Sequence, residues 1–162
     1  MNLRERSINL LKFTRKVSGD TIKGFPDGKA THQPSPTDNH LLWVLGHIAM
    51  TDAWIAGVVG ASGVSVPESY SKVFGQGTKP VGSSPDYPPL PEVKKVFDSS
   101  RQALLAWYDK ASEGALSASL KEKTGGFADD AADAAAKLSW HEGWHMGQVA
   151  NVRKALGLGP VF

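Results

Sequence analysis

Two histidines near the end of the chain carry the clearest chemical signal in the sequence. His141 and His145 are four residues apart, and Glu142 between them completes the letters His-Glu-x-x-His. In a helix this spacing sets both imidazoles one turn apart, about 6 Å along the axis and about 40° around it, so they can converge on one ion. The same letters are typical of zinc metalloproteases, in which the glutamate is the general base. The first question is whether this segment indicates a protease or another metal site.

The helix that carries these histidines is expected to begin near Asp129 and to stop at Gly157. A carboxylate suits the first turn of a helix, and glycine is a common residue just after the last turn. A single inward histidine is more often a hydrogen-bonded core residue, whereas two at this spacing favour a metal. The expected inward face includes both histidines: Ala134, Leu138, His141, His145, Val149, Val152 and Leu156.

A protease of this kind needs a third metal ligand, and the sequence after His145 has none. Where the metzincin pattern continues with glycine and histidine, this chain has Gln148 and Asn151. The tail MGQVANVRKALGLGPVF contains no histidine, aspartate or glutamate, so a thermolysin-like glutamate is missing too. Glu142 lies about 100° around the helix from His141 and is expected to lean towards a neighbouring surface. The third ligand must therefore come from upstream.

The apolar segment NHLLWVLGHIAMTDAWIAGVVG supplies that ligand as His47. His40 lies one heptad earlier, about 10 Å away along a helix axis, which is too far to share an ion with His47. We expect His40 to mark the helix start at the pocket rim, and His32 to lie in a solvated loop. The expected inward face of this helix contains His40, Trp43, Val44, His47, Thr51, Trp54 and Val58.

Four segments with helical periodicity must position these ligands. The first runs from Leu3 to Gly19 or Gly24, and the second ends near Val59, with Asp38 or Asn39 able to cap its start. The third is the clearest amphipathic stretch and has proline in its first turn. Its face contains Val93, Val96, Phe97, Ser100, Leu104, Trp107, Tyr108 and Ala111. The segment from about 129 to 157 is the fourth.

About thirty residues between the second and third helices are rich in glycine, proline and serine. They also contain too many apolar residues for a solvated linker, so we expect a crossover that packs on the bundle and shelters the metal site. The sequence thus predicts an all-α fold, an antiparallel four-helix bundle with a long crossover loop between helices two and three. One domain is expected over residues 1–162.

Composition narrows the chemistry and the partners. The 162 residues include no cysteine, which excludes disulfides, thiolate metal sites and a cysteine nucleophile. The net charge of +2 is spread without a basic stripe, so no nucleic acid partner is expected. The N-terminal segment lacks the apolar core of a secretory signal, and His47 and Asp52 interrupt the one segment long enough to span a membrane. We therefore expect no membrane contact and a cytoplasmic location.

The segments NHLLWVLGHIA and SWHEGWHMGQVANVRKALGL together resemble the DinB/YfiT-like superfamily, as does the loop FGQGTKP that leads towards the third helix. The resemblance implies a bundle that holds one divalent metal through His47, His141 and His145. It also implies a metal-dependent transferase or isomerase that uses a low-molecular-weight thiol such as bacillithiol or mycothiol, and a homodimer.

The sequence allows alternatives for the metal, for the activity and for the roles of several residues. Zn²⁺ fits three imidazoles best and Ni²⁺ next, while Mn²⁺ and Fe²⁺ fit with added water. A non-catalytic metal-containing binding or stress-response module and a metal-dependent hydrolase are alternatives, because no catalytic base can be assigned. Gln148 can orient a metal-bound water or bond a neighbouring helix, and Gly143 and Gly147 suggest close helix packing. The five tryptophans can line a substrate pocket, the core or a dimer interface.

Overall fold

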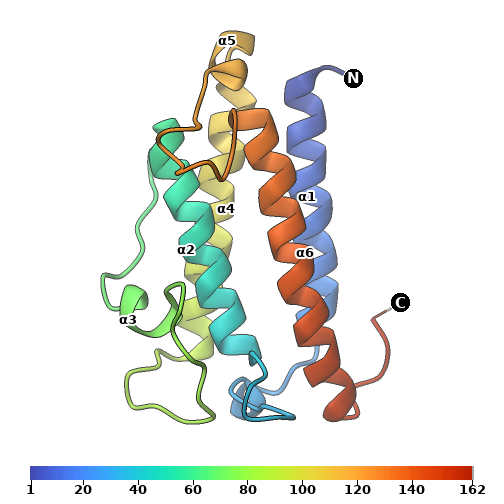
Figure 1. The fold of residues 1–162 in the computed structure, drawn as a ribbon. Coiled ribbons are helices and arrows are strands. Elements are labelled where there is room, and N and C mark those ends of the chain that lie inside the picture. The colour runs from blue at the N-terminus through green and yellow to red at the C-terminus, as the bar shows by residue number, and fades with distance from the viewer. Residues whose placement is uncertain (162) are drawn as a thin grey trace.

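The computed structural model describes residues 1–161, and that range contains helices and no strand (Figure 1). The all-α prediction is confirmed. Four long helices form the body: α1 (Leu3–Ile22), α2 (Leu41–Val59), α4 (Leu90–Lys110) and α6 (Ala131–Ala155). Three short elements lie in the connections: η1 (Asp27–Lys29), α3 (Tyr70–Phe74) and α5 (Glu113–Ser117). The long helices end within a few residues of the positions that capping and periodicity predict.

Side chains at the helix starts explain where the long helices begin. Asn2 and Glu5 form a reciprocal capping box at α1, and the Asp130 carboxylate accepts a hydrogen bond from the backbone amide of Asp133 at α6. At α2 the cap is His40, whose Nδ1 accepts a hydrogen bond from the backbone amide of Trp43. The expectation of a cap from Asp38 or Asn39 was therefore wrong, because the imidazole of His40 takes that role itself.

The two ends of the bundle have separate apolar clusters, which reveal the direction of each helix. The lower cluster in Figure 1 contains the first half of α2, the first half of α4 and the last half of α6. The upper cluster contains the other half of each helix, together with Leu11 of α1. α2 and α4 are therefore parallel to each other, as are α1 and α6, and the two pairs run in opposite directions. The bundle is not antiparallel at every pair, because the crossover between α2 and α4 returns the chain to the end where α2 began.

A layer of buried charges separates the two apolar clusters, and each long helix contributes one residue to it. We call Arg15, Asp52, Arg101 and Glu142 the charge cluster. Arg101 donates to both oxygens of Asp52 at 2.8 and 2.9 Å, and it pairs with Glu142 at 2.7 Å. Arg15 closes the ring with contacts of 2.8 Å to Asp52 and 2.9 Å to Glu142. Two positive and two negative charges thus balance inside the bundle.

Glu142 corrects an expectation from the sequence. Its side chain is fully buried instead of leaning towards a neighbouring surface, and it also accepts a 2.6 Å hydrogen bond from the Ser18 hydroxyl. The inward face of α6 is centred on Glu142, since Leu138 and Val149, which are four residues before it and seven after it, are buried as well. His141 lies at the edge of that face.

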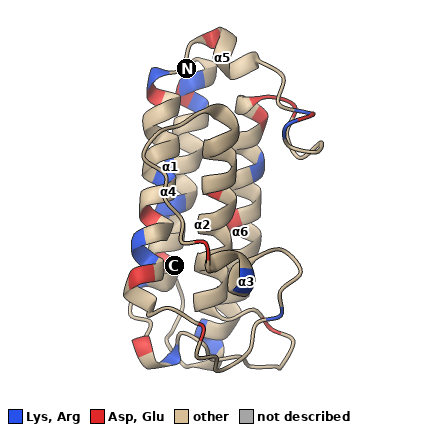
Figure 2. Cartoon of the chain, turned by 90° about the vertical axis from the view of Figure 1, so that its left-hand side faces the viewer, with Lys and Arg blue, Asp and Glu red and all other residues tan. Residues whose placement is uncertain are grey.

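α2 is long and apolar enough to cross a membrane by length and composition alone. In this fold it is a core helix. Its side chains pack against α4 and α6, and Asp52 at its centre is paired with two arginines. Figure 2 shows that charged residues lie along α1 and α4 and in the end loops, while α2 and α6 are mostly uncoloured.

Candidate metal centre

The three predicted histidines meet where α2 faces the middle of α6. One nitrogen from each of His47, His141 and His145 lies within 4.8 Å of the other two. The Nε2 atoms of His47 and His141 are 3.2 Å apart. The three rings also pack edge to face or tilted, with centroids 4.6–5.1 Å apart. α2 contributes one residue and successive turns of α6 contribute two, as the helical spacing predicts.

His47 is held by the crossover and by α2 itself. Its Nδ1 lies 2.9 Å from the backbone carbonyl of Phe74, and only a protonated Nδ1 can donate there. The lone pair of His47 is therefore on Nε2, which faces the other histidines. Trp43 stacks on the imidazole at 4.6 Å between centroids and 11° between planes. Both the tautomer and the ring orientation are thus fixed.

Gly46 allows the Phe74 carbonyl to reach His47. A Cβ atom at position 46 would clash with the aromatic ring of Phe74, so only glycine leaves room for that ring against α2. Phe74 is fully buried, and α3 ends there. This contact fixes the last turn of α3 beside the metal site. The crossover therefore packs on the bundle, as its apolar residues predict.

Hydrogen bonds that involve the side-chain amides of Gln148 and Asn39 hold His145 in place. Its Nδ1 lies 3.0 Å from Oε1 of Gln148, one turn further along α6, and Asn39 donates to the same oxygen at 2.9 Å. Because the two donors converge on Oε1, the amide is fixed and the His145 lone pair is on Nε2. Gln148 therefore orients the imidazole of His145 and is itself held by Asn39, which lies just before α2.

His141 differs from the other two because its Nδ1 is buried and has no hydrogen-bond partner. With Nδ1 of His47 donating to Phe74, the 3.2 Å contact requires Nε2 of His141 to be the donor when no ion is present. This arrangement leaves the Nδ1 lone pair of His141 unsatisfied. A cation bound by all three Nε2 atoms would shift the His141 proton to Nδ1 and would replace the 3.2 Å contact with bonds from both rings to the ion.

The electrostatics keep all three imidazoles neutral. The pKa of His141 is lowered to about 4, first by burial and then by the neighbouring His145 and His47. Burial also lowers the pKa of His47, against the opposing effect of the Phe74 carbonyl. It lowers the pKa of His145 as well, against the hydrogen bond from that ring to Gln148. Neutral imidazole is the form that binds metal, so at neutral pH no proton has to leave.

The donor set fits a transition metal. Two imidazole nitrogens bound to one zinc ion at 2.0–2.1 Å with tetrahedral angles lie about 3.3 Å apart. The observed 3.2 Å between the Nε2 atoms of His47 and His141 is close to that value. The nitrogen of His145 lies no more than 4.8 Å from the other two, so a small rotation of its ring would bring it to the same ion. The residues present could therefore hold a metal ion.

A cavity of about 730 Å³ opens from the triad between α2 and the segment that precedes α6. His47 and His141 form part of its wall. Apolar side chains of Met50, Trp54 and Phe127 form another part, and the rings of Trp54 and Phe127 are 5.5 Å apart. Thr51, Gln76, Thr124 and three glycines complete the lining, which contains no Lys, Arg, Asp or Glu. The triad thus faces a space large enough for a small molecule.

The family model of the DinB superfamily matches residues 10–149 of the chain, a range that includes all three histidines. The chain belongs to the DinB superfamily. The resemblance seen in the two histidine segments is confirmed by a match over most of the length. No curated protein matches the sequence. For this DinB superfamily member, the three histidines and the adjoining cavity are the candidate site.

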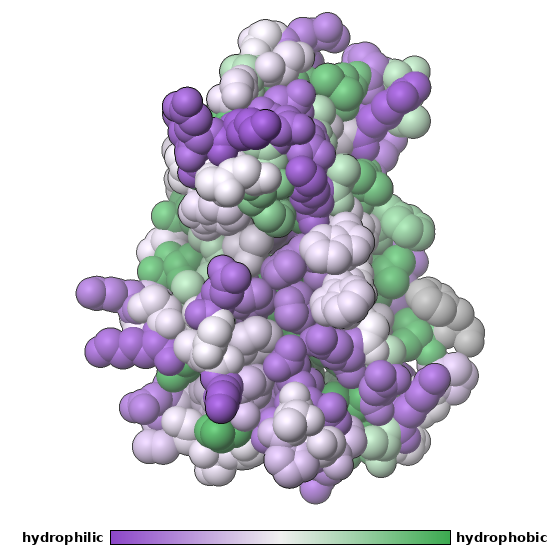
Figure 3. Space-filling view, in the orientation of Figure 1, coloured by the Kyte–Doolittle hydropathy of each residue, from purple (hydrophilic) through white to green (hydrophobic). Residues whose placement is uncertain are grey.

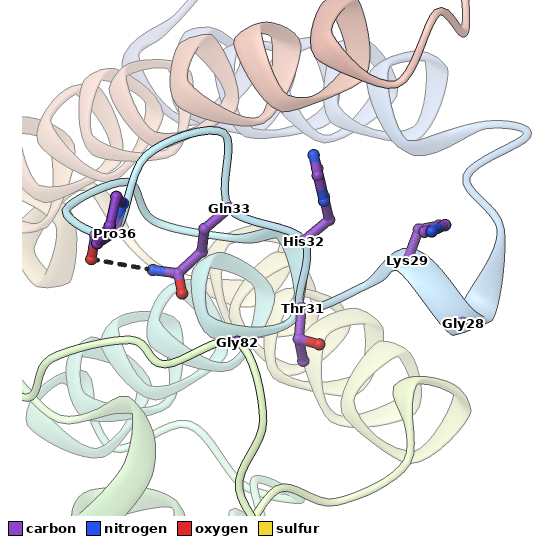
Figure 4. A pocket seen from close by; sticks show the side chains of 7 residues that line it. All are labelled: Gly28, Lys29, Thr31, His32, Gln33, Pro36 and Gly82. Atoms are coloured by element: carbon purple, nitrogen blue, oxygen red, sulfur yellow. Dashed lines mark hydrogen bonds between the residues drawn. The ribbon is translucent and has the colours of Figure 1, made fainter.

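The remaining histidines lie outside the site. His40 begins α2 as predicted, but it is fully buried and its Nε2 lies 3.1 Å from the backbone carbonyl of Val81. His32 lies in the loop between η1 and α2 and lines a polar hollow with Lys29, Thr31 and Gln33 (Figure 4). No carboxylate or second histidine lines that hollow, so it offers no comparable metal site.

The tryptophans divide between interior and surface. Trp43 is buried against the triad, and Trp54 lines the cavity. Trp107 is half-buried at the outer end of the upper cluster, whereas Trp140 and Trp144 are 63% and 61% exposed.

Sequence reasoning missed the charge cluster and the Phe74 carbonyl. Asp52 in an apolar helix and Glu142 in register with Leu138 and Val149 were the signals available for the charge cluster. The Phe74 carbonyl belongs to the backbone, which every residue has, so the sequence gives no signal that it contacts His47.

Proposed function

We propose that His47, His141 and His145 bind one divalent metal ion, Zn²⁺ first and Ni²⁺ next, in a metal-dependent transferase that uses a low-molecular-weight thiol. The observation that carries this proposal is the convergence of three neutral imidazoles, two of them with fixed tautomers, beside an uncharged cavity that His47 and His141 line. Membership of the DinB superfamily supports it.

A metal held by three imidazoles keeps positions open for exchangeable ligands, and it would supply Lewis-acid stabilisation of a bound thiolate. The chain's own residues bind and orient. Trp54, Phe127 and Met50 take the apolar part of a substrate, while Thr51 and Gln76 offer hydrogen bonds to its polar part. Trp43 and Gln148 keep the ligand rings in place.

The absence of a base near the triad favours a thiol over water as the nucleophile. The cavity lining contains no carboxylate or lysine, and Glu142 is committed to Arg15 and Arg101. A thiol with a pKa near 8.5 ionises at a metal without help, whereas hydrolytic enzymes of the His-Glu-x-x-His kind need their glutamate as base. This is why the transferase ranks above a hydrolase.

Two measurements test the proposal in sequence. Elemental analysis of protein purified without added metal should give close to one zinc or nickel per chain. A screen that pairs low-molecular-weight thiols with electrophiles should then show turnover that His47→Ala lacks. Metal without turnover for any pair would support the non-catalytic binding or stress-response module, and no metal would refute the site itself.

A further inference from the structure

One face of α2 holds the crossover at three successive turns of the helix. Each of three rings on that face has a nitrogen within hydrogen-bond distance of the crossover: His40 at Val81, Trp43 at Thr78 and His47 at Phe74, at 3.1, 2.9 and 2.9 Å. Residue numbers rise along α2 while those of the partners fall, so the crossover runs antiparallel to the helix there. Figure 3 shows hydrophilic side chains projecting from the lower left of the molecule, where α3 and the crossover lie in Figure 1.

Thr78 closes a tight turn of the crossover and also binds α2. Its backbone amide and its hydroxyl both lie within hydrogen-bond distance of the Gly75 carbonyl, at 3.1 and 2.8 Å. Gly77 in this turn has a φ of +85°, a conformation that glycine adopts without steric cost. An indole N–H can only donate, so the Thr78 hydroxyl accepts from Trp43 and gives its own proton to the crossover backbone. The direction of both hydrogen bonds is therefore fixed.

Trp43 contacts two of the three rings of the triad. Its indole is stacked on His47 at 4.6 Å between centroids, and it meets His145 edge to face at 5.8 Å. Trp43 is only 5% exposed, so without its acceptor the indole N–H would be buried and unpaired, which is costly. A shift of the indole towards another partner would move the surface on which both imidazoles pack. The placement of Trp43 therefore affects two of the proposed ligands together.

The turn that Thr78 closes also forms part of the cavity wall. Gly75 and Gln76 line the cavity together with His47 and His141, whereas Thr78 is not among the lining residues. A single hydroxyl thus connects the triad, through Trp43, with the wall of the adjoining cavity, through Gly75. Any influence of Thr78 on a bound ion must pass through these neighbours.

We propose that Thr78 is a positioning residue of the metal centre: its hydroxyl holds the indole of Trp43, and the indole holds the rings of His47 and His145. This inference rests on the metal site of the proposed function and makes the crossover a part of that site. Loss of a residue that orients a metal ligand lowers metal affinity by about 10–100-fold. Thr78 is one contact further from the ligands, so we expect an effect near the lower end of that range.

Competition between the full chain and a chelator for Zn²⁺ gives the first test. Thr78→Val keeps the shape of the side chain without the hydroxyl, and it should weaken Zn²⁺ binding by about 10-fold. Thr78→Ser restores the hydroxyl and should recover most of the affinity. Thr31→Val is the matched control, because Thr31 is also partly buried but lies before α2, in the hollow of Figure 4. Equal affinities of Thr78→Val and the wild type would refute the proposal.

A double-mutant cycle separates positioning through Trp43 from a general weakening of the crossover. Trp43→Phe keeps an aromatic ring beside His47 but has no N–H to donate. In that background, Thr78→Val should have no further effect on Zn²⁺ affinity, because the hydrogen bond that it removes is already absent. A loss of the same size in both backgrounds would show that Thr78 acts by another route, and the proposal would be overturned.

A measurement on the metal-free protein keeps this inference separate from the proposed function. The Nδ1 proton that His47 donates to Phe74 can be followed by NMR. It should exchange with solvent faster in Thr78→Val than in the wild type, and at the wild-type rate in Thr78→Ser. A wild type that binds no Zn²⁺ would refute the proposed function, and the exchange rates would still decide whether Thr78 holds the rings. Equal rates in Thr78→Val and the wild type would refute the positioning role.

Discussion

The histidine triad and the charge cluster lie side by side and use their polar groups in opposite ways. His141 and Glu142 are consecutive residues, yet one belongs to each group. In the charge cluster, both carboxylates and both guanidinium groups are engaged with each other. In the triad, one nitrogen from each histidine lies within 4.8 Å of the other two, and His47 and His141 line a cavity. The charge cluster has no group left to bind another molecule, whereas the triad has nitrogens that can bind an ion. The His-Glu-x-x-His letters include residues of both groups, so the motif alone does not tell a binding site from a structural ion pair.

The largest expected effect is on stability, from the charge cluster. Glu142→Gln removes one negative charge and leaves Arg15 and Arg101 facing a single carboxylate in the interior. Removal of one partner from a buried ion pair costs about 3–5 kcal/mol, so the free energy of unfolding should fall by that amount. Urea titration measures it.

Asp133→Asn is the matched control, because that carboxylate pairs with exposed Lys137, and its effect should be small. Burial disfavours the charged form of Arg101, but Asp52 and Glu142 together hold its pKa above the ordinary value. If Glu142→Gln proved as stable as the wild type, the charge cluster would not be the structural element described above. Loss of a peptidase activity in this variant would instead restore the protease hypothesis.

The second largest effect should be on metal affinity, from the triad. His47→Ala, His141→Ala or His145→Ala removes one of the proposed ligands. Loss of a residue that only hydrogen-bonds a ligand weakens metal affinity by up to about 100-fold, so loss of a ligand itself should weaken it by more. Elemental analysis after dialysis should then find little metal in any of the three, and full content in His32→Ala. The metal-free variants should be about as stable as the metal-free wild type, in contrast to Glu142→Gln. A casein assay of the wild type should show no cleavage.

A smaller effect should follow from the support of His47. Gly46→Ala forces the Phe74 ring away from α2, and the hydrogen bond from His47 to the Phe74 carbonyl is lost with it. Metal affinity should fall by about 10–100-fold. Gly57→Ala on the same helix meets nothing, so it should leave affinity unchanged and raise stability by about 0.5–1 kcal/mol. Equal affinities in the two variants, measured by competition with a chelator, would argue against this role of Phe74.

The smallest effect concerns a histidine that belongs to neither group. Burial lowers the pKa of His40 to about 4, below the 6.5 of an unfolded histidine, although its backbone contacts act in the opposite direction. As pH falls, the unfolded chain takes up the proton first. The contribution of His40 is therefore complete above about pH 6.5 and is lost gradually towards about pH 4. His40→Asn keeps a capping side chain without a titrating group, so the stability of the metal-free variant should fall less steeply over this range.

The same lowered pKa values should delay acid release of metal. The triad imidazoles are protonated only below the range near pH 6 that applies to free imidazole, because burial lowers the pKa of each. Metal content should persist at mildly acidic pH and fall as pH approaches 4. Release near pH 6.5 would show that the site is more solvated than its burial indicates.

Helical periodicity was enough to predict that the three histidines lie close together, because their side chains occupy inward or near-inward positions on two long helices. It misplaced Glu142, since an isolated helical wheel does not reveal that arginines from α1 and α4 meet that carboxylate. The direction of α4 relative to α2 depends on how far the crossover travels, which is a property of the folded loop. His40 as a cap and the glycine at position 46 are explained only by their neighbours in space.

The pairing of Arg15 with Glu142 joins residues 127 positions apart, and this separation matters while the chain is being made. A ribosome delivers Arg15, Asp52 and Arg101 long before Glu142, so the growing chain carries two cations for one buried anion. The same late helix contributes two of the three histidines of the triad. Synthesis proceeds at about 5–20 residues per second. The balanced charge cluster and the complete histidine triad therefore arise together, when α6 is made, and a chain released before α6 would have neither.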